Sequence, residues 1–493
     1  MVCSKYVLLL IAATILSCGE GEYNYDHNRK LSDFADFREN NLRLDNTKVA
    51  ENISELLAAD NGGMQADKHT RQLYKSSEGR LLWVSREGLD WRTDSLEKWL
   101  ADVEQTGISP AVYRLSQLTK DLETFRSMDF STDDINKVAA RLDYNLTRAY
   151  MRYVAGQMFG FVSPEATMNR LYEKEPDSTS TTKRYFRLFD IPVSHADDAF
   201  FAKALRMASS DSLPIFLREV QPFGTLYQEL TKKLPGTTGE QRAKILCNIE
   251  RCRWRQKDYP EQHTKYVQVN IPSFSLRAVD GDKKLNMRIG CGAVKTKTPL
   301  ITSRIIRMDM NPQWIVPKSI AKGIAYNYGY MRKENMFIHD KKLGKLPCTE
   351  SNLQKILAGE QYIVQKGGAG NSLGRIIFRF PNNFSVYMHD TNTPWQLQRE
   401  NRAISHGCVR LERPFDLAVF ILKEKDPAKI DRIRELTTKD SVMRTMEVEP
   451  SVPVYINYYT LYPNDSGVLQ SYPDVYGYDK AIMERLSAFI RKE

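Results

Sequence analysis

The periodicity of the apolar residues changes near Tyr266, and this change limits the folds that the chain can adopt. Before it, in residues 76–260, apolar side chains recur every three or four positions, which is typical of amphipathic helices. After it, residues 266–294 alternate apolar and polar side chains around an Asp-Gly-Asp turn, which predicts a β-hairpin. We therefore expect an α+β protein in which a helical scaffold domain at 76–260 precedes a β-rich domain.

The helical segment contains two clear helix signals. Residues 95–107 place their apolar side chains on one face and are predicted to stop at Gly107. Residues 133–154 form a longer apolar pattern that is expected to end before Gly156 and Gly160. The aromatic side chains of these helices are interpreted as core residues, so we assign no catalytic role to this segment.

The β-rich segment contains further strand signals and one insertion. Short apolar runs predict strands at 374–380, 384–390 and 453–459, and a closing helix is expected at 479–490. Between them, residues 311–365 have a mixed composition. This insertion is interpreted either as a lid over a site or as a plain surface excursion, and composition does not decide between the two.

The N-terminus resembles an export signal over residues 1–17. Lys5 is the only charge before an apolar run at 6–16, which is too short to span a bilayer. The run ends in Ile-Leu-Ser-Cys18, which resembles a lipobox, where the cysteine becomes a lipidated N-terminus. The alternative is an ordinary cleaved signal in which Cys18 is incidental. We expect residues 18–75 to form a tether and the first helices. We also expect the protein to be a periplasm-facing lipoprotein of a Gram-negative bacterium, attached to the membrane through its N-terminal lipid.

The charge and the cysteines limit the partners and cofactors. The net charge is +10, and for an exported protein we expect an anionic cell wall rather than a nucleic acid as partner. The sequence contains no CxxC pair and no cysteine cluster with zinc spacing, so no metal or other cofactor is expected. Cys247 and Cys252 point to different faces of a predicted helix and are not expected to pair. Together with Cys291 and Cys348, they are interpreted as small buried apolar residues.

Cys408 is different, because it follows a Ser-His-Gly sequence. A thiol becomes a nucleophile when a neighbour lowers its pKa or takes its proton, and histidine is the usual partner. His406 lies two residues before it, and His389 ends a predicted strand nineteen residues earlier. The backbone N–H groups of Gly407 and Cys408 are candidates for an oxyanion hole. This pattern predicts a Cys/His acyl-transfer enzyme, and the alternative is a structural cysteine near surface histidines.

His389, followed after fifteen residues by Ser405-His406-Gly407-Cys408-Val409-Arg410, resembles the signature of the L,D-transpeptidases, which have a YkuD-type catalytic domain. The preceding GGAGNSLGRIIFRF resembles the strand of that family. The resemblance covers roughly residues 262–425, and we place the catalytic domain at 261–430 and a C-terminal segment at 431–493.

Three further sequences, IERCRWR, NPQWIVP and YPDVYGYD, resemble a larger YcbB-like branch of this family. That branch adds a helical scaffold and a capping insertion, which here corresponds to about 311–365. It usually also has a small peptidoglycan-binding module, but the sequence around 226–251 runs directly from one predicted scaffold helix to the next. No dedicated peptidoglycan-binding module is therefore expected.

The resemblance implies a ping-pong reaction on peptidoglycan peptide stems. Cys408 attacks the meso-diaminopimelate carbonyl of a donor tetrapeptide and expels D-alanine, and the side-chain amine of an acceptor stem then completes a 3–3 crosslink. His389 is the expected base. His406 is expected to support Cys408, since relatives often have serine there.

Four more residues are candidate substrate contacts. Arg410 suits a stem carboxylate or a structural ion pair, and Ser405 lies beside the cysteine motif. Tyr387 shares the face of His389 and Trp395 could line a groove, although either aromatic residue could belong to the core. The same site could use water instead of an amine, as an L,D-carboxypeptidase or endopeptidase. A protein acceptor and a non-catalytic wall-binding scaffold are also compatible with the sequence.

Overall fold

The computed structural model describes residues 44–491, except 86–87, 175–182, 348, 350–351, 369, 423–425 and 439–441. The predicted lipidation site Cys18 and the predicted buried Cys348 lie outside the described residues. Across the part of the chain that is described, no helix is both long and apolar enough to cross a membrane. The chain divides into two compact units, which are described in turn.

The first unit is helical and contains residues up to 103, residues 110–155 and residues 196–220. Its elements are α1 (Asn46–Ala59), α2 (Gln65–Ser76), β1 (Val84–Ser85), β2 (Gly88–Leu89), α3 (Trp91–Ala101), η3 (Pro110–Tyr113), α4 (Leu115–Ser127), most of α5 (Ile135–Phe159), α7 (Asp198–Ala208) and α8 (Leu213–Glu219). Helix α5 is buried along nearly its whole length in this unit. The carboxylates of Asp45 and Asp90 cap the backbone N–H groups that begin α1 and α3.

The two predicted helices are confirmed, but each ends at a residue other than the expected one. Helix α3 ends at Ala101 and is followed by η2 (Val103–Thr106) before Gly107, whose φ of 87° suits glycine. Helix α5 was predicted to end before Gly156, but it continues to Phe159. A Cβ atom at Gly156 would lie 2.1 Å from the Phe161 ring, so this glycine makes room for a packed ring instead of ending the helix.

The second unit is built on a β-barrel. Its strands are β4 (Lys265–Asn270), β5 (Ser275–Asp280), β6 (Lys283–Gly292), β7 (Leu300–Met310), β12 (Ile376–Arg379), β13 (Met388–His389), β15 (Val409–Leu411) and β16 (Arg444–Asn457). They are hydrogen-bonded in the order β12-β13-β15-β6-β5-β4-β16-β7, and β7 also pairs with β12, which closes the ring. Apolar side chains from these strands, including Val269, Ile289, Met308 and Val409, form a continuous buried core.

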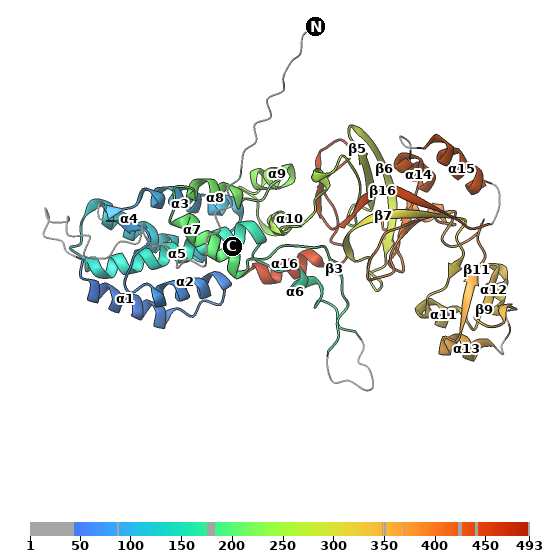
Figure 1. Ribbon diagram of the computed structural model, residues 1–493, viewed down its shortest axis with the longest axis horizontal. Coiled ribbons are helices and arrows are strands. Elements are labelled where there is room, and N and C mark those ends of the chain that lie inside the picture. The colour runs from blue at the N-terminus through green and yellow to red at the C-terminus, as the bar shows by residue number, and fades with distance from the viewer. Residues whose placement is uncertain are drawn as a thin grey trace, which may run out of the picture. The chain divides into compact units, whose positions relative to one another are not determined.

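The remaining elements of this unit pack around the barrel or extend it. Figure 1 shows α14 (Pro414–Leu422) and α15 (Pro427–Thr438) beside the strands. The others are α6 (Pro164–Met168), β3 (Phe189–Asp190), α9 (Thr225–Lys233), α10 (Gly239–Arg253), η4 (Pro260–Gln262), η6 (Pro394–Gln398), β14 (Ala403–Ser405), β17 (Leu461–Pro463), β18 (Leu469–Ser471) and α16 (Tyr478–Leu486). The predicted α+β class, with a helical region and a β-rich catalytic region, is therefore confirmed.

The insertion between β7 and β12 has a core of its own. It contains β8 (Trp314–Ile315), α11 (Lys318–Ile324), α12 (Tyr328–Lys333), β9 (Met336–Asp340), β10 (Gly344–Leu346), α13 (Leu353–Ala358) and β11 (Gln361–Gln365), with the strands in the order β10-β9-β11-β8. Met331, Ile338 and Ile363 are buried at its centre. The insertion is thus a packed lobe rather than an irregular loop, and its action as a lid stays a prediction.

Candidate active site

Two neighbouring parallel strands carry the predicted nucleophile and base. In β13 and β15, Met388 pairs with Val409 and His389 pairs with Arg410. Met388 and Val409 are fully buried in the barrel core. Because side chains alternate along a strand, Cys408 and His389 both project to the outer face of the barrel. The structure therefore brings the two residues of the predicted pair to one face of adjacent strands.

The environment of His389 keeps its imidazole neutral. The side chain is 4% exposed, and its Nδ1 lies 2.5 Å from the main-chain oxygen of Asp390. Burial and the nearby charge of Arg410 lower the pKa of His389 to about 4, against the opposite effect of hydrogen bonds to the Asp390 and Leu373 backbones. With Nδ1 donating its proton to the carbonyl, Nε2 is the nitrogen that can accept a proton.

The environment of Cys408 keeps its thiol protonated. Burial raises the pKa of Cys408 to about 11, although hydrogen bonds from the backbone and side chain of Tyr387 and the charges of Arg379 and Arg410 act in the opposite direction. The resting site therefore holds a neutral thiol and a neutral imidazole at pH 7, not a thiolate–imidazolium pair. A reaction at this thiol requires that a base take its proton as the new bond forms.

Tyr387 connects the two residues. Its phenol is hydrogen-bonded to the thiol of Cys408, and its ring centroid lies 5.7 Å from that of His389 in an edge-on arrangement. The Arg379 guanidinium lies 5.3 Å from the centre of the Tyr387 ring. Of the four predicted substrate contacts, Tyr387 is thus the one that touches both the thiol and the imidazole.

Ser405 holds the turn that precedes the nucleophile. It is 3% exposed, and its hydroxyl accepts a hydrogen bond from the Gly407 N–H at 3.1 Å and donates to the Cys408 carbonyl at 2.6 Å. Because this buried hydroxyl both accepts and donates within the turn, we assign it first to holding the turn, and its contact with substrate stays a prediction. Because the Gly407 N–H is already used, the Cys408 N–H is the better candidate for the oxyanion donor. Gly407 instead supplies the backbone φ of 118° that this turn needs.

A threonine-containing loop, residues 292–298, is hydrogen-bonded to the turn at Ser405–Cys408 that precedes the nucleophilic sulfur. Thr298 Oγ1 donates to the Gly407 carbonyl at 2.8 Å, and Thr296 Oγ1 donates to the Ser405 carbonyl at 2.9 Å. We call this segment the clasp loop. Sequence reasoning missed it, and the one signal that could have found it was the pair of threonines directly after the predicted hairpin.

Tyr476 is hydrogen-bonded to both ends of the clasp loop. Its hydroxyl donates to the Gly292 carbonyl at 2.6 Å and accepts from the Thr298 N–H at 3.2 Å. A hydrogen-bonded chain therefore runs from Tyr476 through Thr298 to the Gly407 carbonyl, next to the nucleophile. Sequence reasoning gave Tyr476 no role, although it lies in the YPDVYGYD segment.

The remaining predicted residues lie around this centre. Arg410 donates from Nη1 to the Gln396 side chain at 2.9 Å, and its buried Nε has no hydrogen-bond partner in the part of the protein that is described. Trp395 is 57% exposed and stacks on Arg399, and its place in a substrate groove stays a prediction. His406 is exposed on the turn. The structure thus groups Arg410 with the centre and leaves Trp395 and His406 at its edge.

The other described cysteines differ from Cys408. Cys247 and Cys291 are fully buried, Cys252 is half-buried, and all three are free thiols. Burial raises the pKa of Cys252 and of Cys291 to about 12. Among the residues placed by the structure, no group of three or more His, Cys, Asp or Glu side chains could hold a metal ion.

Comparison with known proteins gives two family matches and one curated relative. Residues 264–439 match the family model described as the L,D-transpeptidase catalytic domain, named YkuD, and residues 68–234 match a model described as a scaffold domain. A Haemophilus influenzae protein to which L,D-transpeptidase activity is attributed is 24% identical over 347 residues, which cover 68% of this chain and 69% of that protein. These matches do not test the YcbB-like branch, which stays a prediction.

Solved structures of L,D-transpeptidases also match. A structure from Mycobacterium smegmatis is 14% identical in sequence to this chain. The matched region covers 39% of this chain and 58% of the M. smegmatis chain, with a TM-score of 0.20. A mutant enzyme from Enterococcus faecium is 12% identical in sequence. Here the matched region covers 59% of this chain and 75% of the E. faecium chain, with a TM-score of 0.18. TM-scores this low support no residue-level comparison.

Proposed function

We propose that this chain, which carries the catalytic domain of the L,D-transpeptidase family, joins peptidoglycan peptide stems by 3–3 crosslinks through a thioester on Cys408. The observation that supports this proposal most is the pairing of β13 with β15, which places a buried neutral imidazole and a thiol on one outward face. Cys408 is the nucleophile and His389 is the base.

In the first half-reaction, the thiol attacks the meso-diaminopimelate carbonyl of a donor tetrapeptide stem. His389 Nε2 takes the thiol proton while the sulfur–carbon bond forms, and the Cys408 N–H donates to the developing oxyanion. When the intermediate collapses, the bond to the terminal D-alanine breaks. The departing amine takes the proton from His389, which leaves a thioester and a neutral imidazole.

In the second half-reaction, the side-chain amine of an acceptor stem attacks the thioester carbonyl. His389 accepts a proton from this amine and returns it to the departing sulfur, so the free thiol is restored. Charge develops only during each step, because both groups are neutral at rest. The charges of Arg379 and Arg410 favour the negative sulfur, as do the hydrogen bonds from Tyr387.

We also propose a location for this reaction. The apolar run that ends in Ile-Leu-Ser-Cys18 supports export and a lipid anchor, and the net charge of +10 supports a position beside the anionic cell wall. In this arrangement the catalytic domain faces the periplasm, where peptide stems are within its reach.

The test is product analysis with purified disaccharide-tetrapeptide as both donor and acceptor. Mass spectrometry should show a crosslinked dimer with the wild-type chain and no product with Cys408→Ala. A tripeptide without dimer would mean that water is the acceptor and that the protein is an L,D-carboxypeptidase. The absence of any product from folded wild-type protein would contradict the proposed chemistry.

A further inference from the structure

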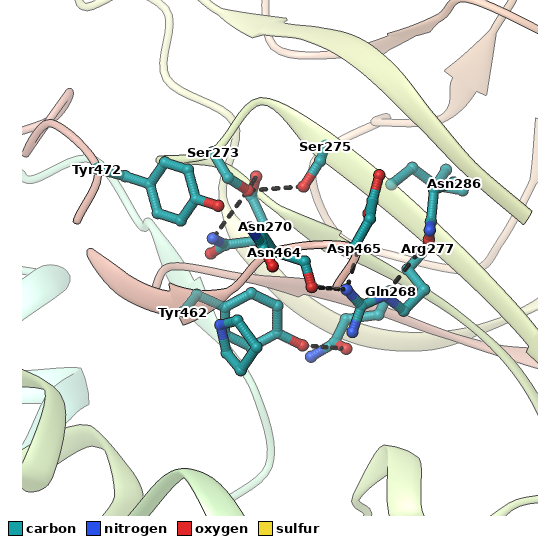
Figure 2. Close-up of a pocket in the computed structure, with 12 residues that line it drawn as sticks. Gln268, Asn270, Ser273, Ser275, Arg277, Asn286, Tyr462, Asn464, Asp465 and Tyr472 are labelled. Carbon is teal, nitrogen blue, oxygen red and sulfur yellow. Dashed lines mark hydrogen bonds and ion pairs between the residues drawn. The ribbon is translucent and has the colours of Figure 1, made fainter. Parts of the chain in front are cut away.

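A polar pocket lies on the outer face of the barrel, away from Cys408. It has a volume of about 140 Å³ and lies where β4, β5 and β6 meet the segment 462–472. Figure 2 shows side chains from the strands and from this segment converging on it, among them Gln268, Arg277, Tyr462 and Tyr472. A cavity of this size has room for several water molecules or for one ring-sized group.

Hydrogen bonds within the wall fix the polar groups of this pocket. Tyr462 donates from its hydroxyl to Gln268 Oε1 at 2.7 Å, which directs the Gln268 amide. The hydroxyls of Ser273 and Ser275 lie 2.6 Å apart, within hydrogen-bonding distance. The wall is therefore a set of preorganised amide and hydroxyl groups beside tyrosine rings, which can hydrogen-bond a ligand without first reorganising.

The pocket carries no excess charge, although the chain is strongly basic. Arg277 is the cation that lines it, and its Nη2 donates to the Asn464 carbonyl at 3.0 Å and lies 3.8 Å from the Asp465 carboxylate. Its Nε donates to Asn286 Oδ1 at 3.3 Å. With the guanidinium matched in this way, a neutral ligand fits the pocket better than an anion.

We propose that this pocket binds one neutral sugar unit, specifically an N-acetylated hexosamine. Such a unit offers hydroxyl groups and an amide to the wall, and an apolar ring face to the half-buried ring of Tyr472. The identification of its natural source as the glycan strand of peptidoglycan rests on the proposed function. The pocket would then hold the glycan in a chain whose sequence predicts no dedicated peptidoglycan-binding module.

The strand register puts the pocket within reach of a substrate bound at Cys408. Gly290 of β6 pairs with Arg410 of β15, and Asn286, which lines the pocket, lies four residues further along β6. By the same antiparallel register, Cys408 lies level with Gly292, two residues beyond Gly290 and so six residues from Asn286. At about 3.3 Å per residue, the path along β6 between these two levels is about 20 Å. Met287 and Ile289 point into the core, so Asn286 and Cys408 share the outer face. Binding the glycan there would help to position its peptide stem at the thiol.

The test measures binding of a tetrasaccharide of β-1,4-linked N-acetylglucosamine to the full chain by isothermal titration. Asn286→Ala and Tyr472→Ala should each weaken binding about tenfold or more, which corresponds to about 1.4 kcal/mol. Tyr326→Ala is the matched control, because Tyr326 is 62% exposed in the insertion, and it should bind like wild type. The proposal is overturned if wild type does not bind at millimolar sugar, or if both pocket variants bind like wild type.

A second readout separates this proposal from the proposed function. Acylation of Cys408 by a carbapenem, which has no sugar, should proceed at the wild-type rate in Asn286→Ala and Tyr472→Ala. Wild-type protein that binds the tetrasaccharide but is not acylated would contradict the catalytic proposal and support the pocket. Pocket variants that lose both properties would indicate a shared structural defect and overturn the assignment of a separate site.

Discussion

The helical unit and the β-rich unit both bury ionisable side chains, but Asp67 in the first is matched by its neighbours, whereas His389 in the second keeps one ring nitrogen as a proton acceptor. In the helical unit, Asp67 is fully buried and accepts hydrogen bonds from Arg152 at 2.6 and 2.8 Å, from Arg148 at 3.1 Å and from the Met64 N–H at 3.0 Å. In the β-rich unit, His389 bonds through Nδ1 to a carbonyl and keeps Nε2 as a proton acceptor.

The pKa directions express the same difference. Burial acts to raise the pKa of Asp67, but hydrogen bonding and the charges of Arg152 and Arg148 outweigh it, and the pKa lies below its ordinary value. For His389, burial and the charge of Arg410 both lower the pKa, and no carboxylate in the described structure offsets them. A buried charge that is matched by its neighbours makes the fold sensitive to the loss of either partner, whereas a buried neutral base on the same face as a thiol can serve catalysis.

The largest effect is expected at the nucleophile. Cys408→Ala should lower crosslinking by about 10⁴-fold or more, because no other group can form the thioester. Urea unfolding should be nearly unchanged, since the thiol is not part of the barrel core. Cys291→Ala is the control and should keep appreciable turnover. Activity in folded Cys408→Ala together with an inactive Cys291→Ala would show that the wrong thiol had been assigned.

The next effect concerns the base. His389→Ala should slow single-turnover acylation by about 10²–10⁴-fold, the usual contribution of a positioned acid–base group. His406→Ser should have a much smaller effect, because His406 is exposed on the turn. The reversed ranking of the two variants would assign the base to His406.

Asp67, the buried carboxylate of the helical unit, should affect the stability of the fold and not the rate of acylation. Asp67→Ala should lower the free energy of unfolding by about 3–5 kcal/mol, because it removes the carboxylate that pairs with Arg152 and leaves Arg148 with only Asp60 as an ion-pair partner in the described structure. Asp94→Ala removes an exposed ion pair to Arg126 and should cost less than about 1 kcal/mol. Denaturant unfolding measures both variants, and the acylation rate of folded Asp67→Ala should equal that of wild type.

The pH dependence of this stability has a defined sign. The folded-state pKa of Asp67 is lowered, so its contribution is present above the unfolded value near 3.9 and is lost as pH falls through the folded value. The difference in stability between wild type and Asp67→Ala should therefore narrow in acid. A difference that grows in acid would contradict the assigned ion pairs.

The smallest effect is expected at Tyr476, which acts as a positioning residue through the clasp loop. Tyr476→Phe removes a hydroxyl that bridges Gly292 and Thr298, and kcat should fall about five- to tenfold, corresponding to a loss of about 1 kcal/mol, with little change in KM. Tyr478→Phe is the matched control, because its buried hydroxyl has no partner in the described structure. Equal kcat values for the two variants would contradict the proposal that Tyr476 positions the nucleophile through the clasp loop.

The sequence predicted the fold class and the elements near the site because these depend on local patterns. Alternation of side chains indicated β5 and β6, and the motif spacing put His389 and Cys408 on neighbouring segments. The closure of the barrel between β7 and β12 was not predicted, because it depends on pairing between residues distant in sequence.

The clasp loop and the burial of Ser405 were missed for a related reason. Thr298 and Tyr476 are separated by 178 residues, and only the folded backbone brings them together. Ser405 was predicted to contact substrate from its place in the motif, but its hydroxyl is consumed within the turn. Sequence position indicated which residues lie near the thiol, and hydrogen bonding determined which of them are free to act.

The most direct test of the central claim is intact-protein mass spectrometry of the full chain after incubation with a carbapenem. A strained β-lactam carbonyl should be opened by Cys408 once His389 takes the thiol proton, which leaves a thioester. The account predicts the addition of one drug mass, mapped to Cys408 by peptide digestion and absent in Cys408→Ala. Folded protein that stays unmodified at millimolar carbapenem, or an adduct on another cysteine, would contradict it.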